Sequence, residues 1–134
     1  MLKLFFDGGC RPNPGAMEAA VSVRGITHHW PALGLGDNND AEWLALIQAA
    51  SLARTLGAVD VVLVGDSALV IAQAKRVQPC RAPRLEAHRL AFDAIVSGFG
   101  RVRFRQVARS HNLAGSALER IRAGLFGATL IVHA

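Results

Sequence analysis

Apolar positions recur along the chain with different spacings, and these spacings mark the predicted elements. Residues 18–24 alternate apolar and polar side chains, which is typical of a half-buried strand. Residues 59–64 are almost continuously apolar, as in a strand buried on both faces. From Ala41 to Ala53 apolar residues return every three or four positions, which indicates a helix. The whole chain read in this way predicts strands at 2–6, 18–24, 26–33, 59–64 and 101–107, and helices from the cap-like cluster at 37–39 to about 56, from 68 to 77, from 84 to 97 and from 113 to 125.

The order of these elements predicts the fold class. Three consecutive strands form an antiparallel meander, and the helical crossovers that follow add strands parallel to the first one. We therefore expect an α/β fold with a five-stranded mixed sheet, in which three antiparallel strands precede two parallel ones and helices flank the sheet. The apolar tail at 127–134 can add an edge strand.

Composition narrows the class of protein further. The chain has 134 residues, of which 51% are hydrophobic, and this is enough apolar material for one domain with a core. The apolar content excludes intrinsic disorder, and two cysteines, Cys10 and Cys80, are too few for a disulfide scaffold. We expect both to be thiols in a reducing compartment and the protein to be cytoplasmic. No apolar run approaches the ~20 residues of a membrane helix, so we expect no membrane partner. Lys3 and Asp7 interrupt the apolar start of the chain, which therefore does not read as a signal peptide.

Charge is divided unevenly between the two halves of the chain. Residues 1–66 hold four basic and seven acidic residues, a net charge of −3, whereas residues 67–134 hold eleven basic and three acidic ones, a net charge of +8. Thirteen of the fifteen cations are arginines, whose planar guanidinium suits bidentate contacts with phosphate. A basic half indicates a polyanion such as nucleic acid, but a basic protein without such a partner has the same composition. Charge alone leaves both interpretations open.

Three carboxylates stand at positions that the predicted sheet brings together. Asp7 ends the first strand and Asp66 ends the fourth, and because these strands run parallel near the centre of the sheet, both side chains emerge at one end. Glu42 lies in the first turn of the helix after the meander, near that end. Carboxylates so close repel one another, and a hard divalent cation such as Mg²⁺ resolves the repulsion. Two such ions about 4 Å apart can activate water and stabilise the leaving oxygen of a phosphodiester.

Each of these acids also has an ordinary interpretation. Asp7 can be a turn residue, and Asp40 and Glu42 can be first-turn acids that the helix dipole favours. For one acid alone this interpretation is the better one. For three acids at strand and helix ends of one sheet, the metal site is the better interpretation.

Four motifs resemble those of type 1 ribonuclease H, in the order and at the spacing of that family. Residues 7–15 read DGGCRPNPG, which is similar to the family's opening motif. Residues 38–42 read NNDAE and residues 65–67 read GDS, and both are similar to carboxylate-bearing motifs of the family. Residues 107–112, VARSHN, resemble the lead into its last helix. One such motif is weak evidence, but four in order identify residues 1–126 as a single ribonuclease H-like domain, of the short subgroup without a basic protrusion.

The resemblance implies endonucleolytic cleavage of the RNA strand of an RNA–DNA hybrid by a monomer that uses two Mg²⁺ ions, or Mn²⁺ in their place. Asp7, Glu42 and Asp66 then correspond to metal ligands, and Glu42 also lies near the RNA 2′-hydroxyl. Asparagine side chains and free backbone groups in the glycine turn and before the helix face the minor groove, where that hydroxyl distinguishes RNA from DNA. The residues that correspond to substrate contacts are Gly8, Gly9, Cys10, Asn13, Asn38, Asn39, Ser67, Arg109 and Asn112. For the asparagine pair, helix capping is the alternative.

The family's fourth carboxylate is missing. Its last motif reads Asn-x-x-Ala-Asp, whereas residues 112–116 read NLAGS, so that Ser116 stands at the carboxylate position and offers a poorer ligand. Three interpretations stay open: Ser116 holds a metal through water with reduced activity; Glu119, one turn further along the helix, replaces the carboxylate; or the domain binds hybrid or duplex without effective cleavage. Because the other three carboxylates are kept, we expect retained but metal-sensitive activity, with Ser116 among the catalytic residues.

His111 precedes the last predicted helix, where the family often has a histidine that helps proton transfer or product release. Histidine suits that role because the ordinary pKa of its side chain, about 6.5, lies near physiological pH. A solvent-exposed loop histidine is an equal alternative.

Two groups of basic residues are candidates for backbone contacts. The first group, which can follow a phosphate backbone, is Lys75, Arg76, Arg81, Arg84 and Arg89. The second, which shares one face of a strand and which we interpret as a solvated face, is Arg101, Arg103 and Arg105.

Overall fold

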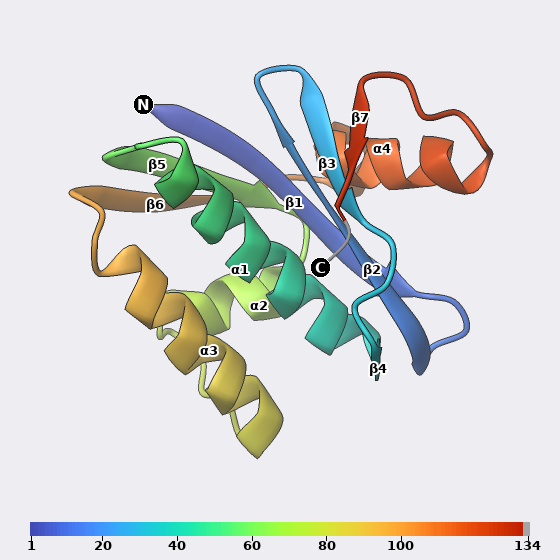
Figure 1. The fold of residues 1–134 in the computed structure, drawn as a ribbon. Coiled ribbons are helices and arrows are strands. Elements are labelled where there is room, and N and C mark those ends of the chain that lie inside the picture. Colours follow the sequence, from blue (N-terminus) through green and yellow to red (C-terminus); the bar gives the residue numbers. More distant parts are fainter. Residues whose placement is uncertain (133–134) are drawn as a thin grey trace.

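In the computed structural model, which describes residues 1–132, one twisted sheet runs through the middle of the molecule (Figure 1). Its strands are ordered β6-β5-β1-β2-β3-β7, and β4 pairs with β2 beside this path. β1, β2 and β3 form an antiparallel meander, and β5 and β6 are parallel additions on the other side of β1. The strands are β1 Leu2–Cys10, β2 Gly15–Val23, β3 Ile26–Trp30, β4 Leu35–Gly36, β5 Asp60–Gly65, β6 Arg101–Gln106 and β7 Thr129–Ile131.

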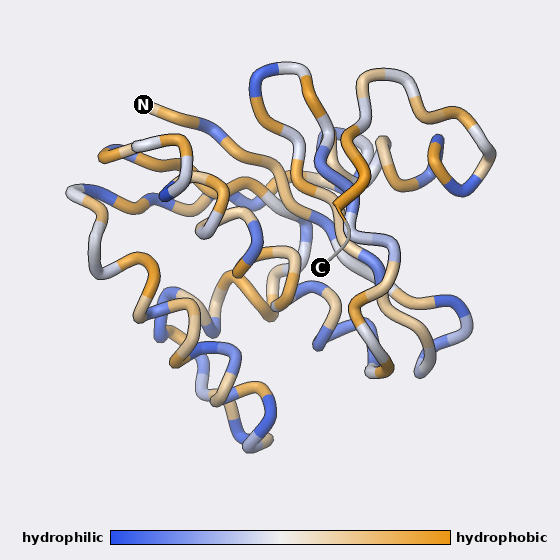
Figure 2. Tube along the Cα trace, in the orientation of Figure 1, coloured by the Kyte–Doolittle hydropathy of each residue, from blue (hydrophilic) through white to orange (hydrophobic). Residues whose placement is uncertain are grey.

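Helices cover both faces of this sheet (Figure 1). They are α1 Asn38–Thr55, α2 Ala68–Ala74, α3 Pro83–Val96 and α4 Leu113–Arg122, with a 3-10 turn at Arg109–His111. The main core lies between the sheet and α1 to α3, whereas a smaller cluster built on Phe5 and Ala20 lies under α4 on the opposite face. In Figure 2, hydrophobic residues recur along the strands and helices, and hydrophilic ones gather at several turns and helix ends. No helix among the described residues is both long and apolar enough to cross a membrane.

Helix α1 packs on the sheet with a row of alanines on its buried side. Alanines at 41, 45, 49 and 53 are all completely buried along this face. The helix begins at a capping box, in which the Asp37 carboxylate accepts a hydrogen bond from the Asp40 amide and the Asp40 carboxylate accepts one from the Asp37 amide. It ends before Gly57, which takes a positive φ of 73°. Both ends of α1 are therefore defined by local sequence, and its first turn is held against β1.

The five predicted strands and four predicted helices are confirmed, and two short strands extend the sheet. β3 ends at Trp30 rather than at residue 33, and the chain then forms β4, which pairs with Gly15 and Ala16 of β2. β7 pairs in parallel with β3, so the described part of the 127–134 tail belongs to the sheet; residues 133 and 134 lie outside the described part. Strands of two and three residues are too short to show a period. Helices α2 and α4 each end three residues before the predicted end.

Candidate active site

The three predicted metal ligands meet at one end of the sheet. A carboxylate oxygen from each of Asp7, Glu42 and Asp66 lies within 4.8 Å of the other two, and no other group of three such side chains is found among residues 1–132. Asp7 extends from β1 and Asp66 follows β5, and the parallel pairing of these strands places the two side by side. Asp7 is 1% exposed and Glu42 is 8% exposed. The site is therefore a carboxylate cluster in which Asp7 and Glu42 are buried and Asp66 is partly exposed.

Glu42 reaches the cluster because β1 touches the first turn of α1 at Gly8. A Cβ atom at position 8 would lie 2.1 Å from the Ala41 carbonyl oxygen, a distance that no real side chain allows. The Gly8 amide donates a hydrogen bond of 3.2 Å to Oε1 of Glu42. Glycine at position 8 thus lets the helix approach the strand and at the same time orients the carboxylate.

Burial makes the ionised cluster unstable without a cation. Burial raises the pKa of Asp7 above its usual value, and the nearby Asp66 carboxylate adds to the rise. Burial also raises the pKa of Glu42 well above its usual value, and repulsion from Asp7 adds to it. Oε2 of Glu42 is buried without a hydrogen-bond partner among the described residues. Carboxylate oxygens that repel one another, one of them without a partner, are a donor set that Mg²⁺ and Mn²⁺ take, so these residues fit a divalent ion.

Arg109 supplies positive charge at this position. One guanidinium nitrogen, Nη1, lies 3.3 Å from Oδ1 of Asp7 and 3.4 Å from Oδ2 of Asp66. The other, Nη2, lies 3.5 Å from Oε1 of Glu119. The attraction of Asp7 raises the pKa of Arg109 above its usual value, so this side chain stays charged. Arg109 was predicted as a substrate contact, and in this structure its guanidinium forms ion pairs with two of the candidate metal ligands.

The structure does not bring Glu119 into the carboxylate cluster. Its carboxylate is half-exposed and is surrounded by the guanidinium groups of Arg11, Arg109 and Arg122 at 3.1, 3.5 and 3.3 Å. An acid held by three cations is a poor replacement for the missing fourth ligand. Of the alternatives raised by the sequence, direct substitution by Glu119 therefore has no support in this geometry.

The first turn of α4 lies directly against Asp7. A Cβ atom on Gly115 would lie 3.5 Å from Oδ2 of Asp7, and Ser116 is the next residue, half-buried on the same turn. A serine there contributes a hydroxyl and no negative charge. Ser116 as a ligand or catalytic residue stays a prediction.

Asn112 holds this turn in place. It is completely buried, and its amide group donates to the Phe6 carbonyl oxygen at 3.0 Å and to Oδ2 of Asp66 at 3.2 Å. Its side-chain oxygen accepts from the Ala114 amide at 3.1 Å and so caps α4. The sequence resemblance assigned Asn112 to substrate binding, but its burial and internal bonds make it a positioning residue that joins α4, β1 and Asp66.

The glycine turn and the asparagine pair form one network beside the cluster. The side-chain oxygen of Asn38 accepts from the Cys10 amide at 3.1 Å, and that of Asn13 accepts from the Asn38 amide at 3.1 Å. A pocket of about 260 Å³ is lined by Gly9, Cys10 and Asn38 together with Asp7 and Glu42. Helix capping is done by Asp37, so the alternative that Asn38 and Asn39 serve as caps is not what the structure shows.

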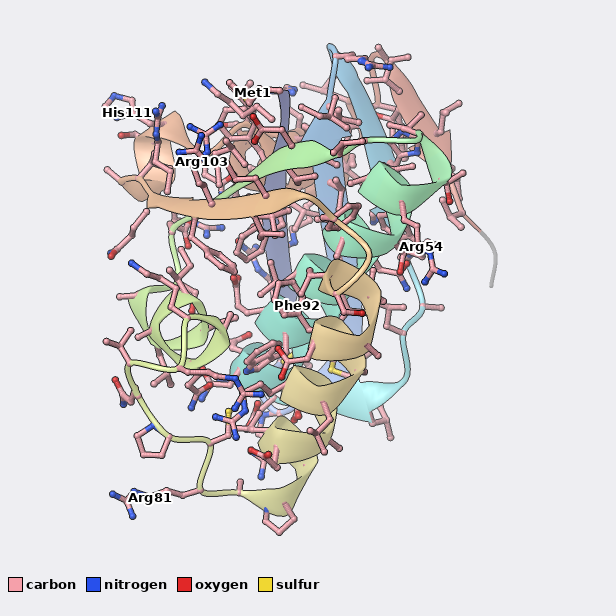
Figure 3. The ribbon with its side chains drawn as sticks, turned by 90° about the vertical axis from the view of Figure 1, so that its left-hand side faces the viewer. Met1, Arg54, Arg81, Phe92, Arg103 and His111 are labelled. Carbon is pink, nitrogen blue, oxygen red and sulfur yellow. The ribbon has the colours of Figure 1, made fainter. Side chains whose placement is uncertain are left out.

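Two further predicted residues, Ser67 and His111, lie just before helices. The Ser67 hydroxyl accepts from the Val70 amide at 3.3 Å and caps α2, which fixes the backbone directly after Asp66. His111 lies in the exposed 3-10 turn before α4, at the periphery of the molecule in Figure 3. Its side chain makes no hydrogen bond to any other residue of the described chain. Its proposed role in proton transfer therefore stays a prediction.

Most of the first group of basic residues is already paired. Arg84 binds Asp37 and Asp40, Arg76 binds Asp93, and Arg89 binds Glu86. The sequence could not show the two pairs of Arg84, because both partners lie more than forty positions away. Lys75 and Arg81 are exposed and make no ion pair within residues 1–132, so they alone of this group keep the charge that a phosphate backbone needs.

Sequence reasoning missed two residues that line the pocket, Arg11 and Arg122. Arg122, at the end of α4, binds Oε2 of Glu18 at 3.1 Å and Oε1 of Glu119 at 3.3 Å, and its guanidinium lies close to Gly9. The spacing of three between Glu119 and Arg122 is a local signal for an ion pair. The contact with Gly9 spans more than a hundred positions and had no signal in the sequence.

Known proteins match this chain over most of its length. The family model described as reverse transcriptase-like matches residues 7–118. Ribonuclease HI of Halobacterium salinarum is 34% identical over 119 residues, which cover 85% of this chain and 60% of that protein, so the chain spans little more than half of this relative. The crystal structure of RNase H1 from the same organism has a TM-score of 0.83 at 28% identity and covers 92% of this chain and 98% of the solved one.

Two further solved structures have the same fold. The N-terminal RNase H domain of a Mycobacterium tuberculosis protein, solved as a fusion with maltose-binding protein, has a TM-score of 0.78 at 27% identity and covers 92% of this chain and 96% of that chain. LC11-RNase H1, solved in complex with RNA/DNA hybrid, has a TM-score of 0.77 at 23% identity over 84% of this chain and 89% of that chain, a likeness of fold alone. The chain therefore belongs to the reverse transcriptase-like family, and it is similar to ribonuclease HI proteins.

Proposed function

We propose that this protein is a metal-dependent endonuclease that hydrolyses the RNA strand of RNA–DNA hybrids by a two-metal mechanism. The observation that carries the proposal is the buried carboxylate cluster of Asp7, Glu42 and Asp66, with oxygens within 4.8 Å of one another. The similarity of the chain to ribonuclease HI, and the hybrid complex of a protein with the same fold, support the choice of substrate. When bound, Mg²⁺ or Mn²⁺ supplies Lewis acidity and lowers the pKa of a coordinated water.

The residues of this chain position the substrate and hold the ligands. Asp7, Glu42 and Asp66 provide the oxygens, and Gly8 and Asn112 fix two of these carboxylates through the bonds described above. Cys10 and Asn38 line the wall of the adjoining pocket, and the Asn13 side chain accepts a hydrogen bond from the Asn38 amide; amide groups of this wall can meet a 2′-hydroxyl. Since only the RNA strand carries that hydroxyl, this wall is the element that we expect to distinguish RNA from DNA.

The test is cleavage of a hybrid with a label on the RNA strand, in Mg²⁺ and separately in Mn²⁺. We expect the hybrid to be cut, and a DNA duplex and an RNA duplex of the same sequence to remain intact. Equal cleavage of the hybrid and the RNA duplex would contradict the substrate assignment.

A second candidate function has specific support in Ser116 and Arg109. With serine at the fourth carboxylate position and a guanidinium against Asp7 and Asp66, the chain can be a module that binds hybrid or duplex with weak or no cleavage. Hybrid binding without cleavage under both metals would establish this second function.

We further infer a cytoplasmic monomer. The three carboxylates all come from one chain, so the site is complete without a partner. Cys10 and Cys80 are both free thiols, as in a reducing compartment. Size-exclusion chromatography with light scattering tests the monomer, and a stable dimer would contradict it.

A further inference from the structure

A second pocket lies on the α4-covered face of the sheet, away from the carboxylate cluster. It has a volume of about 160 Å³ and is formed by the start of β1, the β2–β3 hairpin and one side of α4. Its polar lining is Lys3, Ser22, Arg24, Thr27 and Arg120, and Phe5 forms an apolar wall. Lys3 precedes Asp7 by four residues on the same face of β1, which separates the pocket from the cluster by roughly 13 Å along the strand.

Three cations converge on this pocket without an acid. Lys3, Arg24 and Arg120 come from three different elements, and none of them forms an ion pair within residues 1–132, whereas the arginines around the carboxylate cluster are all paired. The Lys3 ammonium lies 5.9 Å from the centroid of the Phe5 ring. Like charges brought together in this way favour an anion between them.

The backbone at Arg24 is not what local preference would select. Arg24 and Gly25 form the two-residue turn between β2 and β3, with φ values of 53° and 79°. Such a turn strongly favours asparagine or aspartate followed by glycine, and a long side chain with positive φ is uncommon there. Arginine at position 24 therefore costs local stability and places a guanidinium at the mouth of the pocket.

The pocket also contains a hydroxyl donor. Ser22 and Thr27 lie opposite each other on β2 and β3, each is 7% exposed, and their hydroxyl oxygens are 2.8 Å apart. Only one of the two hydroxyl protons is used in their mutual bond, so the other hydroxyl can donate to a ligand. Three cations and a buried hydroxyl donor form a suitable set for the several oxygens of a phosphate group.

We propose that this pocket binds a phosphate group of a nucleic-acid strand. The positive charge continues on the surface around the pocket. Lys3 of β1 lies opposite Val62 of β5, which in turn lies opposite Arg103 of β6. Lys3 and Arg103 therefore lie in one row on the same face of the sheet. Figure 3 shows Arg103 on the side of β6 away from α2 and α3. Arg101 and Arg105 share this face by alternation, and Asp60 is the acid that pairs with Arg103. The choice of nucleic acid as the source of the phosphate rests on the proposed function, whereas the phosphate chemistry does not.

The experiment measures binding to the full chain in EDTA, so that the carboxylate cluster and its metal take no part. The isotope-labelled protein is titrated first with inorganic phosphate and then with a single-stranded oligonucleotide that has or lacks a 5′-phosphate. Binding is followed by the amide chemical shifts of the protein. We expect saturable shifts at Lys3, Arg24, Thr27 and Arg120. Arg120→Gln and Arg24→Asn, the second of which suits the turn, should each weaken phosphate binding about fivefold or more and lower the salt slope of oligonucleotide binding by about 0.7.

Arg54→Gln, which removes an exposed cation in the last turn of α1, is the matched control and should leave phosphate binding unchanged. Binding of only the 5′-phosphorylated oligonucleotide would assign a terminal phosphate, and binding of both would assign a backbone phosphate; either result supports the proposal. Absence of saturable shifts with inorganic phosphate, or unaltered binding in Arg120→Gln and Arg24→Asn, would overturn it. Phosphate binding without oligonucleotide binding would overturn the nucleic-acid source. Because no metal or cleavage is involved, failure here is distinct from failure of the proposed nuclease.

Discussion

Arg109 competes with a divalent ion for two of its candidate ligands, and its removal should strengthen metal binding. Nη1 lies 3.3 Å from Asp7 and 3.4 Å from Asp66. Coulomb's law with an effective dielectric constant of about 20 gives roughly 5 kcal/mol for a pair at this distance. The Arg109 side chain is 54% exposed, and pairs with an exposed partner are measured at about 1 kcal/mol or less each. Two such contacts total about 1–2 kcal/mol, which corresponds to roughly 5- to 30-fold in an equilibrium constant.

The assay is isothermal titration of Mg²⁺ into the nucleic-acid-free protein at fixed pH. Arg109→Gln should bind Mg²⁺ roughly 5- to 30-fold more tightly than the wild type by the same arithmetic. Arg81→Gln is the matched control: it removes the same charge from an exposed position at the opposite end of the molecule from His111, as Figure 3 shows, and should leave the affinity unchanged. Unchanged or weaker Mg²⁺ binding in Arg109→Gln would refute the competition between guanidinium and metal.

Three further changes test the geometry of the site. Ser116→Asp restores a carboxylate beside Asp7, and we expect tighter Mg²⁺ binding and faster hybrid cleavage; a slower rate would mean that the serine site is built differently. Gly8→Ala places a Cβ atom 2.1 Å from the Ala41 carbonyl oxygen and should lower the free energy of unfolding in urea by about 3 kcal/mol or more; wild-type stability would contradict this close contact. The raised pKa of Glu42 means that its protonated form contributes stability, which is complete below the usual value near 4.5 and is lost as pH rises through the folded pKa. Glu42→Gln should therefore raise the melting temperature of the metal-free protein above neutral pH and have little effect near pH 4; an equal effect at both would show that the pKa is not raised.

The sequence was most informative where local and periodic signals coincide. The alternation in β2, the apolar run of β5 and the small-residue face of α1 were sufficient for the order of the strands, and strand order was sufficient to bring Asp7 and Asp66 together. The edge strand expected in the apolar tail is confirmed as β7, whereas β4 was not predicted, because two residues cannot show a period. Their pairing depends on where β2 and β3 leave free hydrogen-bonding groups.

Side-chain roles were harder to predict than positions. Asn112 belongs to a recognisable motif, but only the folded chain shows that it is fully buried and bound to Phe6 and Asp66. Arg84 was expected on a phosphate backbone and is instead bound to Asp37 and Asp40, more than forty positions away. Ion pairs between residues far apart in the chain depend on tertiary contacts, and a single sequence carries no signal for them.

The most direct test of the central claim is a strand-resolved cleavage assay that compares the wild type with Asp7→Asn. The substrate is one hybrid prepared twice, with the label on the RNA strand or on the DNA strand, in the presence of Mg²⁺. The carboxylate cluster predicts cleavage of the RNA strand alone by the wild type, and no cleavage by Asp7→Asn, which keeps the size of the side chain and removes its charge. Cleavage of the DNA strand, or RNA cleavage by Asp7→Asn at the wild-type rate, would contradict the account.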